Sequence, residues 1–136
     1  MNLKKSYKEQ YGYERVVTDR NSPLTYTELD FLKLADGQSY TVTEKNKEFA
    51  LIVIYGKCEV KGADFHFASV GKRKDPFDGP AEAVYVGKDT EFTVTGKGGD
   101  VKIAVCKAPA EKFFPAHHVK TEDILQKSLG KGAFAR

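Results

Sequence analysis

The sequence lacks the features that mark membrane-spanning, secreted or disulfide-stabilised proteins. None of its apolar runs reaches the roughly 18 residues that a transmembrane helix requires. Residues 1–13 are polar and contain no apolar core of a secretory signal, so we expect a cytoplasmic protein with no membrane partner. The only cysteines are Cys58 and Cys106, and in the absence of a signal we interpret them as reduced core residues.

A strong excess of charge of one sign is also absent. The 22 Lys and Arg residues are nearly balanced by 19 Asp and Glu residues, and the net charge is +3. A nucleic-acid-binding protein usually has a denser and more clustered basic excess, so we expect no nucleic-acid partner. With 40% hydrophobic residues among 136, the chain has the composition of one folded domain.

What the sequence does contain is a series of short runs rich in β-forming residues. They are separated by turns of glycine, aspartate and lysine, and a 3.6-residue period is almost absent. The pattern predicts an all-β protein, an antiparallel jelly-roll barrel or sandwich of about eight strands. The expected strands are Leu24–Leu34, Ser39–Thr43, Glu48–Tyr55, Cys58–Val60, Asp64–Val70, Ala83–Val86, Phe92–Thr95 and Val101–Lys107.

The two ends of the chain differ from this central part. We predict an N-terminal arm at 1–23, a barrel at 24–116 and a C-terminal tail or linker at 117–136. The arm is charged and rich in tyrosine, and we expect it to lie across the barrel or to pair with another subunit. Thr121–Leu129 is the one helical candidate, and an extended tail is an equal alternative.

Motifs for metal or nucleophilic chemistry are missing. His66 lies between two phenylalanines, and we interpret it as a solvated or hydrogen-bonded strand residue. His117 and His118 are adjacent in an expected loop, and neighbouring side chains on an extended backbone rarely bind one ion together. No G-x-S-x-G turn is present, and Gly96–Gly99 lacks the spacing of a phosphate-binding loop. We therefore predict no metal site and assign no catalytic residue.

Two features remain as candidate ligand-binding groups. Glu48 opens the most apolar strand, where it could face the barrel mouth or simply be an exposed strand start. Lys72, Arg73 and Lys74 form a short basic group, which fits a solvated turn better than a phosphate site.

Four phrases in order resemble the 5-deoxy-glucuronate isomerase family, which belongs to the cupin superfamily and is related to the 5-keto-4-deoxyuronate isomerases. The first resembles the central hairpin of a cupin, and the others resemble family phrases of the types G-x-R-x-x-x-F-x-x-x-P-x-x-x-Y-V-P, A-x-A-P-A and R-G-x-G-x-x-x-R. They are Glu48–Val60, Val70–Gly87, Val105–Ala110 and Leu129–Arg136. Positions Gly87 and Leu129 depart from the pattern, which prefers Pro and Arg there.

The resemblance implies a two-cupin protein of about twice this length, active in myo-inositol catabolism. Its divalent metal, such as zinc, is implied to sit in the second cupin on an H-x-H phrase, a Glu and a later His. Here Thr43–Lys47 occupy the stretch where a cupin would carry H-x-H, and Phe92 lies near the place of the later His. The resemblance thus describes this chain as a metal-free half.

Two functional hypotheses follow. In the first, the chain is the N-terminal cupin domain of such an isomerase, structural rather than catalytic on its own. Its partners would be the second cupin and a small sugar-acid substrate, and Arg73 would grip a substrate carboxylate or hold the domain interface. In the second, it is a free-standing, non-enzymatic cupin that binds a small ligand or forms a homodimer.

Overall fold

The computed structural model describes residues 4–134, which form ten strands, two short 3-10 turns and no α-helix. The larger sheet contains β1 (Gly12–Val17), β2 (Glu28–Leu34), β4 (Lys47–Tyr55), β7 (Ala83–Val86), β9 (Val101–Pro109) and β10 (His117–Val119). Its order is β1-β2-β9-β4-β7-β10. The smaller sheet contains β3 (Ser39–Val42), β5 (Cys58–Gly62), β6 (His66–Val70) and β8 (Phe92–Gly96), in the order β3-β8-β5-β6.

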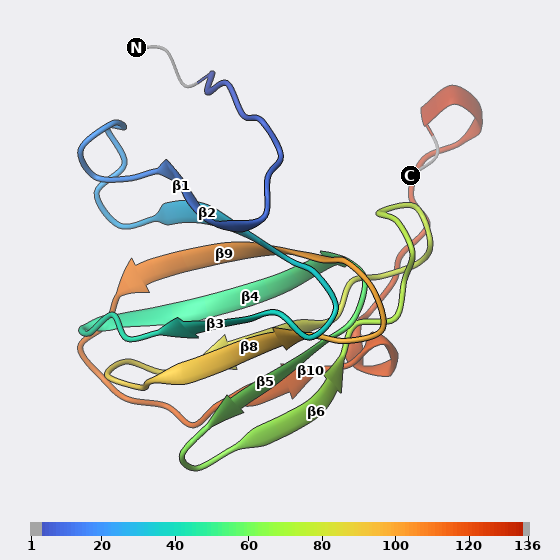
Figure 1. Cartoon of the computed structure of the whole chain (residues 1–136). Helices are drawn as coiled ribbons and strands as arrows, with labels where there is room; N and C mark the ends of the chain where they lie inside the picture. The colour runs from blue at the N-terminus through green and yellow to red at the C-terminus, as the bar shows by residue number, and fades with distance from the viewer. Residues whose placement is uncertain (1–3, 135–136) are drawn as a thin grey trace.

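The two sheets face each other as layers of one barrel (Figure 1). Every strand pair is antiparallel, so the predicted all-β jelly-roll class is confirmed. The structure has ten strands rather than about eight, because β1 and β10 form within the segments predicted as arm and tail. They are the two edge strands of the larger sheet, paired with β2 and β7.

Alternation of apolar residues along the strands builds the core. In β9, every second residue from Val101 to Lys107 is buried, and the residues between them are half-buried on the outer face. The same period runs through β2 and β4. The buried side chains of both sheets form one cluster, because strands with a period of two place all their apolar residues on one face.

The tight turn between β4 and β5 depends on glycine. Gly56 has φ +88°, and a Cβ at this position would lie 2.3 Å from the carbonyl oxygen of Asp100. Only glycine adopts this conformation at little cost and also permits such a close approach of two backbones. The turn brings the start of β5 against the loop before β9.

The N-terminal segment before β1 lies across the outer face of the larger sheet. This agrees with the first of the two predicted alternatives, an arm that lies across the barrel. The ring of Tyr7 packs on Phe31 of β2 with centroids 4.7 Å apart, and the ammonium of Lys102 in β9 lies over both rings. The carboxylate of Glu9 forms an ion pair with the same lysine at 2.9 Å.

The C-terminal segment contains no α-helix where Thr121–Leu129 was the candidate. A single 3-10 turn, Thr121–Asp123, follows β10, and a second covers Gly132–Phe134. Neither is long enough to cross a membrane, and no other helix occurs in the described part of the chain. Residues 1–3 of the predicted arm and residues 135–136, which end the last resemblance phrase, lie outside the described residues. The division into arm, barrel and tail stays a prediction.

Candidate functional site

The barrel interior is apolar where the resemblance would place a metal-ligating histidine. Phe92, the first residue of β8, packs edge-on against Phe49 of β4 with ring centroids 5.4 Å apart, and each residue is 1% exposed. Among residues 4–134, no three His, Cys, Asp or Glu side chains are grouped so that they could hold a metal ion. The residues of this barrel therefore do not fit the zinc that the resemblance assigns to the second cupin.

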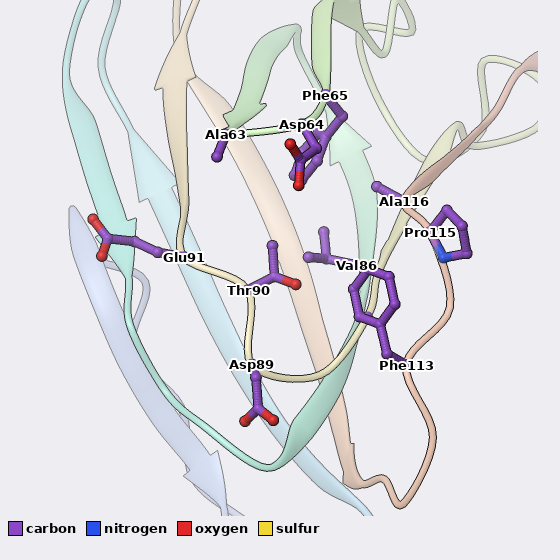
Figure 2. Close-up of a pocket in the computed structure, with 11 residues that line it drawn as sticks. Ala63, Asp64, Phe65, Val86, Asp89, Thr90, Glu91, Phe113, Pro115 and Ala116 are labelled. Atoms are coloured by element: carbon purple, nitrogen blue, oxygen red, sulfur yellow. The ribbon is translucent and has the colours of Figure 1, made fainter.

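A hollow of about 470 Å³ opens at one end of the barrel (Figure 2). Its floor and sides are apolar, formed by Phe65, Val86 and Phe113 among others. Asp64, Asp89 and Glu91 are the acidic residues of its lining, and the carboxylate of Glu91 points away from the hollow (Figure 2). No Lys, Arg or His is among its lining residues. A lining with acidic residues and no basic residue favours a neutral or cationic ligand over an anion, because carboxylates give a cleft a negative potential.

One side of the hollow is closed by the segment before β10. A Cβ on Gly87 would lie 2.2 Å from the carbonyl oxygen of Phe114, so only glycine lets this segment lie so close to the end of β7. Phe113 then places its ring beside Val86 (Figure 2). The departure from the family phrase at Gly87 thus has a structural reason.

Next to this hollow, the same end of the barrel contains a buried network of charges. The ammonium of Lys107 is fully buried and lies 3.0 Å from Asp30, 2.7 Å from Glu44 and 3.4 Å from Glu28. Lys47 bridges Glu28 and Glu44 at 3.0 and 2.9 Å. Charges out of water are tolerated only when they are paired in this way.

Contacts within the network favour the charged form of Lys107 and the neutral form of the neighbouring Tyr13. Burial alone would lower the pKa of Lys107, but its hydrogen bonds with Glu44 and Asp30 outweigh that effect and leave the pKa above the ordinary value. Burial, together with the hydrogen bond that its hydroxyl donates to Asp30, raises the pKa of Tyr13 well above the usual range. A protonated lysine and a neutral phenol stabilise the structure, but they supply neither a base nor a nucleophile.

A second shielded pair was missed at the sequence level. The imidazole Nε2 of His118 in β10 lies 2.7 Å from Glu82, just before β7, and both side chains are about 10% exposed. The ring of Phe67 packs on His118 at 5.6 Å. The strand signal that could have found the pair is the period of two, which puts His118 on the same face as its β7 partner Val84.

The other histidines lie at the surface. His117 and His118 belong to the short strand β10, so the prediction of a loop is wrong. Their side chains point to opposite faces of the strand, as expected, and His117 is exposed. His66 pairs with Glu59 at 2.7 Å on the outer face of the smaller sheet. Among residues 4–134, neither histidine belongs to a group of three His, Cys, Asp or Glu residues that could hold a metal ion.

Glu48 does not face the barrel interior. Its neighbour Phe49 points inward, so Glu48 points to the outer face of the larger sheet, where it accepts a 2.7 Å hydrogen bond from Tyr85. A shallow hollow of about 190 Å³ lies there, bordered also by Cys106. Of the two alternatives for Glu48, this position fits a strand start on the outer face, and ligand binding by Glu48 stays a prediction. Cys106 is half-buried on this outer face rather than in the core, and both cysteines are free.

Arg73 lies at the opposite end of the barrel and is held by the backbone. Its Nε donates to the carbonyl of Ile54 at 2.8 Å, and its Nη1 donates to Pro76 and Gly79 at 3.2 and 2.9 Å. These bonds position the loop between β6 and β7. A contact of Arg73 with a substrate carboxylate stays a prediction.

Comparison with known proteins identifies the family of this chain. The KduI/IolB family model matches residues 2–136. The chain belongs to the KduI/IolB family. It is 37% identical over 108 residues to a 5-deoxy-glucuronate isomerase of Bacillus subtilis. The aligned region covers 79% of this chain and 40% of that protein. A second 5-deoxy-glucuronate isomerase, from Halalkalibacterium halodurans, is 32% identical over 117 residues, or 85% of this chain and 43% of that protein.

Solved structures agree with the fold of this KduI/IolB chain. An IolB-like protein from Salmonella typhimurium superposes with a TM-score of 0.86 at 29% identity, covering 93% of this chain and 48% of that one. An RmlC-like cupin with a double-stranded β-helix fold from Methanocaldococcus jannaschii gives a TM-score of 0.59 at 16% identity, over 80% of this chain and 92% of that one. The barrel therefore has the cupin fold. The chain spans less than half the length of the curated relatives it matches.

Proposed function

We propose that this chain is the N-terminal, metal-free cupin domain of a 5-deoxy-glucuronate isomerase and that its role is structural. The isomerisation would take place in myo-inositol catabolism in the cytoplasm, and this half would support the second cupin rather than carry out the chemistry. The single observation that carries the proposal is the match to 5-deoxy-glucuronate isomerases over only 40–43% of their length.

The interior of the barrel supports a non-catalytic role. An aldose–ketose isomerisation requires a polarised carbonyl and a base that moves a proton between neighbouring carbons. In this barrel, Phe49 and Phe92 fill the interior, and Lys107 is held protonated by three carboxylates. The open end has an acidic lining, which would repel the carboxylate of a sugar acid.

The proposal assigns the metal and substrate to the second cupin. In that half, an H-x-H phrase, a Glu and a later His would hold zinc, and the sugar acid would bind beside it. Arg73 in this half would position the loop between β6 and β7 and hold the domain interface rather than touch the substrate.

An isomerase assay on the purified 136-residue chain tests this proposal. We expect no turnover of 5-deoxy-glucuronate with added zinc or manganese, while the Bacillus subtilis relative, assayed in parallel, should be active. Turnover by the isolated chain above the no-enzyme rate would contradict the structural role. A circular-dichroism spectrum typical of β-sheet, measured on the same sample, would show that an inactive chain is folded.

The second candidate function is a free-standing cupin that binds a small ligand or forms a homodimer. The hollow beside Asp64 and Phe113 favours it, because an apolar cleft with a few polar groups is the usual form of a small-molecule site. The reading frame after Arg136 separates the two candidates. A continuation containing H-x-H and Glu supports the isomerase half, whereas a stop codon supports the free-standing module.

A further inference from the structure

A basic groove of about 320 Å³ lies at the end of the barrel opposite the acidic hollow. It is formed by three loops, at residues 56–57, 72–74 and 97–100. Five of its lining residues carry positive charge, and Asp100 is its one carboxylate. The cationic residues are Lys57, Lys72, Arg73, Lys74 and Lys97.

Three of these ammonium groups are free to bind an anion. Lys57, Lys72 and Lys74 are exposed, and no salt bridge or side-chain hydrogen bond engages their ammonium groups within residues 4–134. Lys97 is only loosely paired, 3.6 Å from Glu59. Nε and Nη1 of Arg73 already donate to backbone carbonyls. The lysines, and not the arginine, are therefore the binding groups.

The carboxylates near the groove are already engaged. Asp100 accepts a 2.7 Å hydrogen bond from the hydroxyl of Tyr11. Asp36 accepts from the backbone N–H of Gly98 at 2.7 Å, and Asp78 accepts from the backbone N–H of Lys74 at 3.1 Å. These carboxylates stiffen the loops that carry the lysines and form no ion pair with them.

Backbone contacts hold the three loops together. The N–H of Gly56 donates to the carbonyl of Arg73 at 2.9 Å, and the N–H of Lys97 donates to the carbonyl of Lys57 at 3.0 Å. A Cβ on Gly71 would lie 2.6 Å from the carbonyl oxygen of Gly56. The lysines therefore project from a rigid base, which lowers the entropy that binding would cost.

We propose that this groove binds the phosphate group of a small anionic molecule. An ammonium is a compact point charge that several lysines can direct at one multiply charged oxyanion, whereas a single carboxylate is best gripped by the planar fork of an arginine. In this groove Nε and Nη1 of Arg73 are engaged by backbone carbonyls, whereas the ammonium groups of Lys57, Lys72 and Lys74 have no ion-pair partner within residues 4–134. The inference is independent of the proposed isomerase role, because it uses neither the second cupin nor a metal.

Titration of the chain with inorganic phosphate, followed by backbone amide NMR, tests the inference. We expect saturable shifts centred on Lys57, Lys72, Lys74 and Lys97. The double variant Lys72→Gln/Lys74→Gln should bind roughly tenfold more weakly, as expected for the loss of two exposed charge contacts. The matched control is Lys61→Gln/Lys112→Gln, which removes the same charge from exposed lysines outside the groove and should leave the affinity unchanged.

Two further titrations identify the anion. A sugar phosphate that saturates the same amides more tightly than inorganic phosphate assigns the site to a phosphate monoester, and equal affinities assign it to free phosphate. Acetate at the same ionic strength should give no saturable shift. Equal weakening in both double variants, shifts outside the groove, or an equal response to acetate would overturn the inference in favour of general counter-ion attraction.

Discussion

At the scale of single residues, Lys107 is a charged side chain at a buried position of the barrel, 2% exposed. It lies on the inner face of β9, on the same side of the strand as Val105 and Ile103, where an apolar residue would continue the pattern. It is retained there because Asp30, Glu28 and Glu44 surround its ammonium. Replacing one member of such a buried network leaves an uncompensated charge out of water.

We therefore expect Lys107→Met to lower the free energy of unfolding by about 3–5 kcal/mol, the usual effect of removing one partner from a buried ion pair. Urea denaturation followed by circular dichroism measures the change. The control is Lys33→Met, because Lys33 pairs with Glu9 at 3.4 Å on the outer face, where solvent screens the pair, and its loss should change the stability little. Similar losses in both variants would contradict the assigned role of the network.

At the scale of elements, the connections decide the geometry of the barrel ends. Gly56 has φ +88° and touches the backbone of Asp100, so the β4–β5 turn and the loop before β9 are fitted to each other. Gly79 has a similar φ of +80°, but no atom lies within 4 Å of the place of its Cβ. Substitutions at the two glycines therefore separate the cost of a positive φ, which both share, from the cost of a steric clash, which only Gly56 adds.

We expect Gly79→Ala to cost about 1 kcal/mol, because alanine is strained at positive φ. Gly56→Ala has the same strain and a clash at 2.3 Å as well, so it should cost at least about 2 kcal/mol. Denaturation midpoints of the two variants provide the comparison. Equal losses would show that the contact with Asp100 is not tight in solution.

At the scale of the whole molecule, the ionic network makes stability depend on pH. Burial raises the pKa of Glu28 and of Glu44, but hydrogen bonds with Lys47 and Lys107 outweigh it and leave both pKa values below 4.5. A carboxylate whose pKa is lower in the folded chain stabilises the fold above its unfolded pKa. That stabilisation is lost as the pH falls through the folded value. The network joins the β3–β4 connection to β2 and β9, so acid weakens the barrel as a unit.

The free energy of unfolding should therefore decrease as the pH falls below about 4.5. Lys47→Gln should flatten this decrease, since it removes a cation that lowers both pKa values. Lys72→Gln, a change of the same charge with no carboxylate partner in the described chain, should leave the pH slope unaltered. Urea denaturation at several values between about pH 3 and pH 7 measures the slopes. A slope that is steeper in Lys47→Gln than in the wild type would contradict the assignment.

Most of the fold was predictable from local pattern. The strand periods, the Gly and Asp turns and the family phrases predicted an antiparallel cupin barrel, which the structure confirms. The edge strands β1 and β10 were not predicted, because their sequences carry little apolar signal and they form only by pairing with β2 and β7. The candidate helix over Thr121–Leu129 does not form for a related reason. Its apolar residues Leu125 and Leu129 are exposed and have no core to pack against.

The candidate sites were less predictable. Glu48 and Phe49 are neighbours in sequence, and pairing decided which one faces the interior, since a shift of one residue moves every side chain to the opposite face. Asp30 and Lys107, or Glu82 and His118, are distant along the chain and meet only because their strands and connections are adjacent in the larger sheet. The sequence by itself determined the strand-forming segments, the apolar residue at Phe92 and the kinship with the KduI/IolB family. Only the tertiary structure decided which charges pair in the interior and which lysines share the basic groove, because contacts between distant segments depend on sheet order and register.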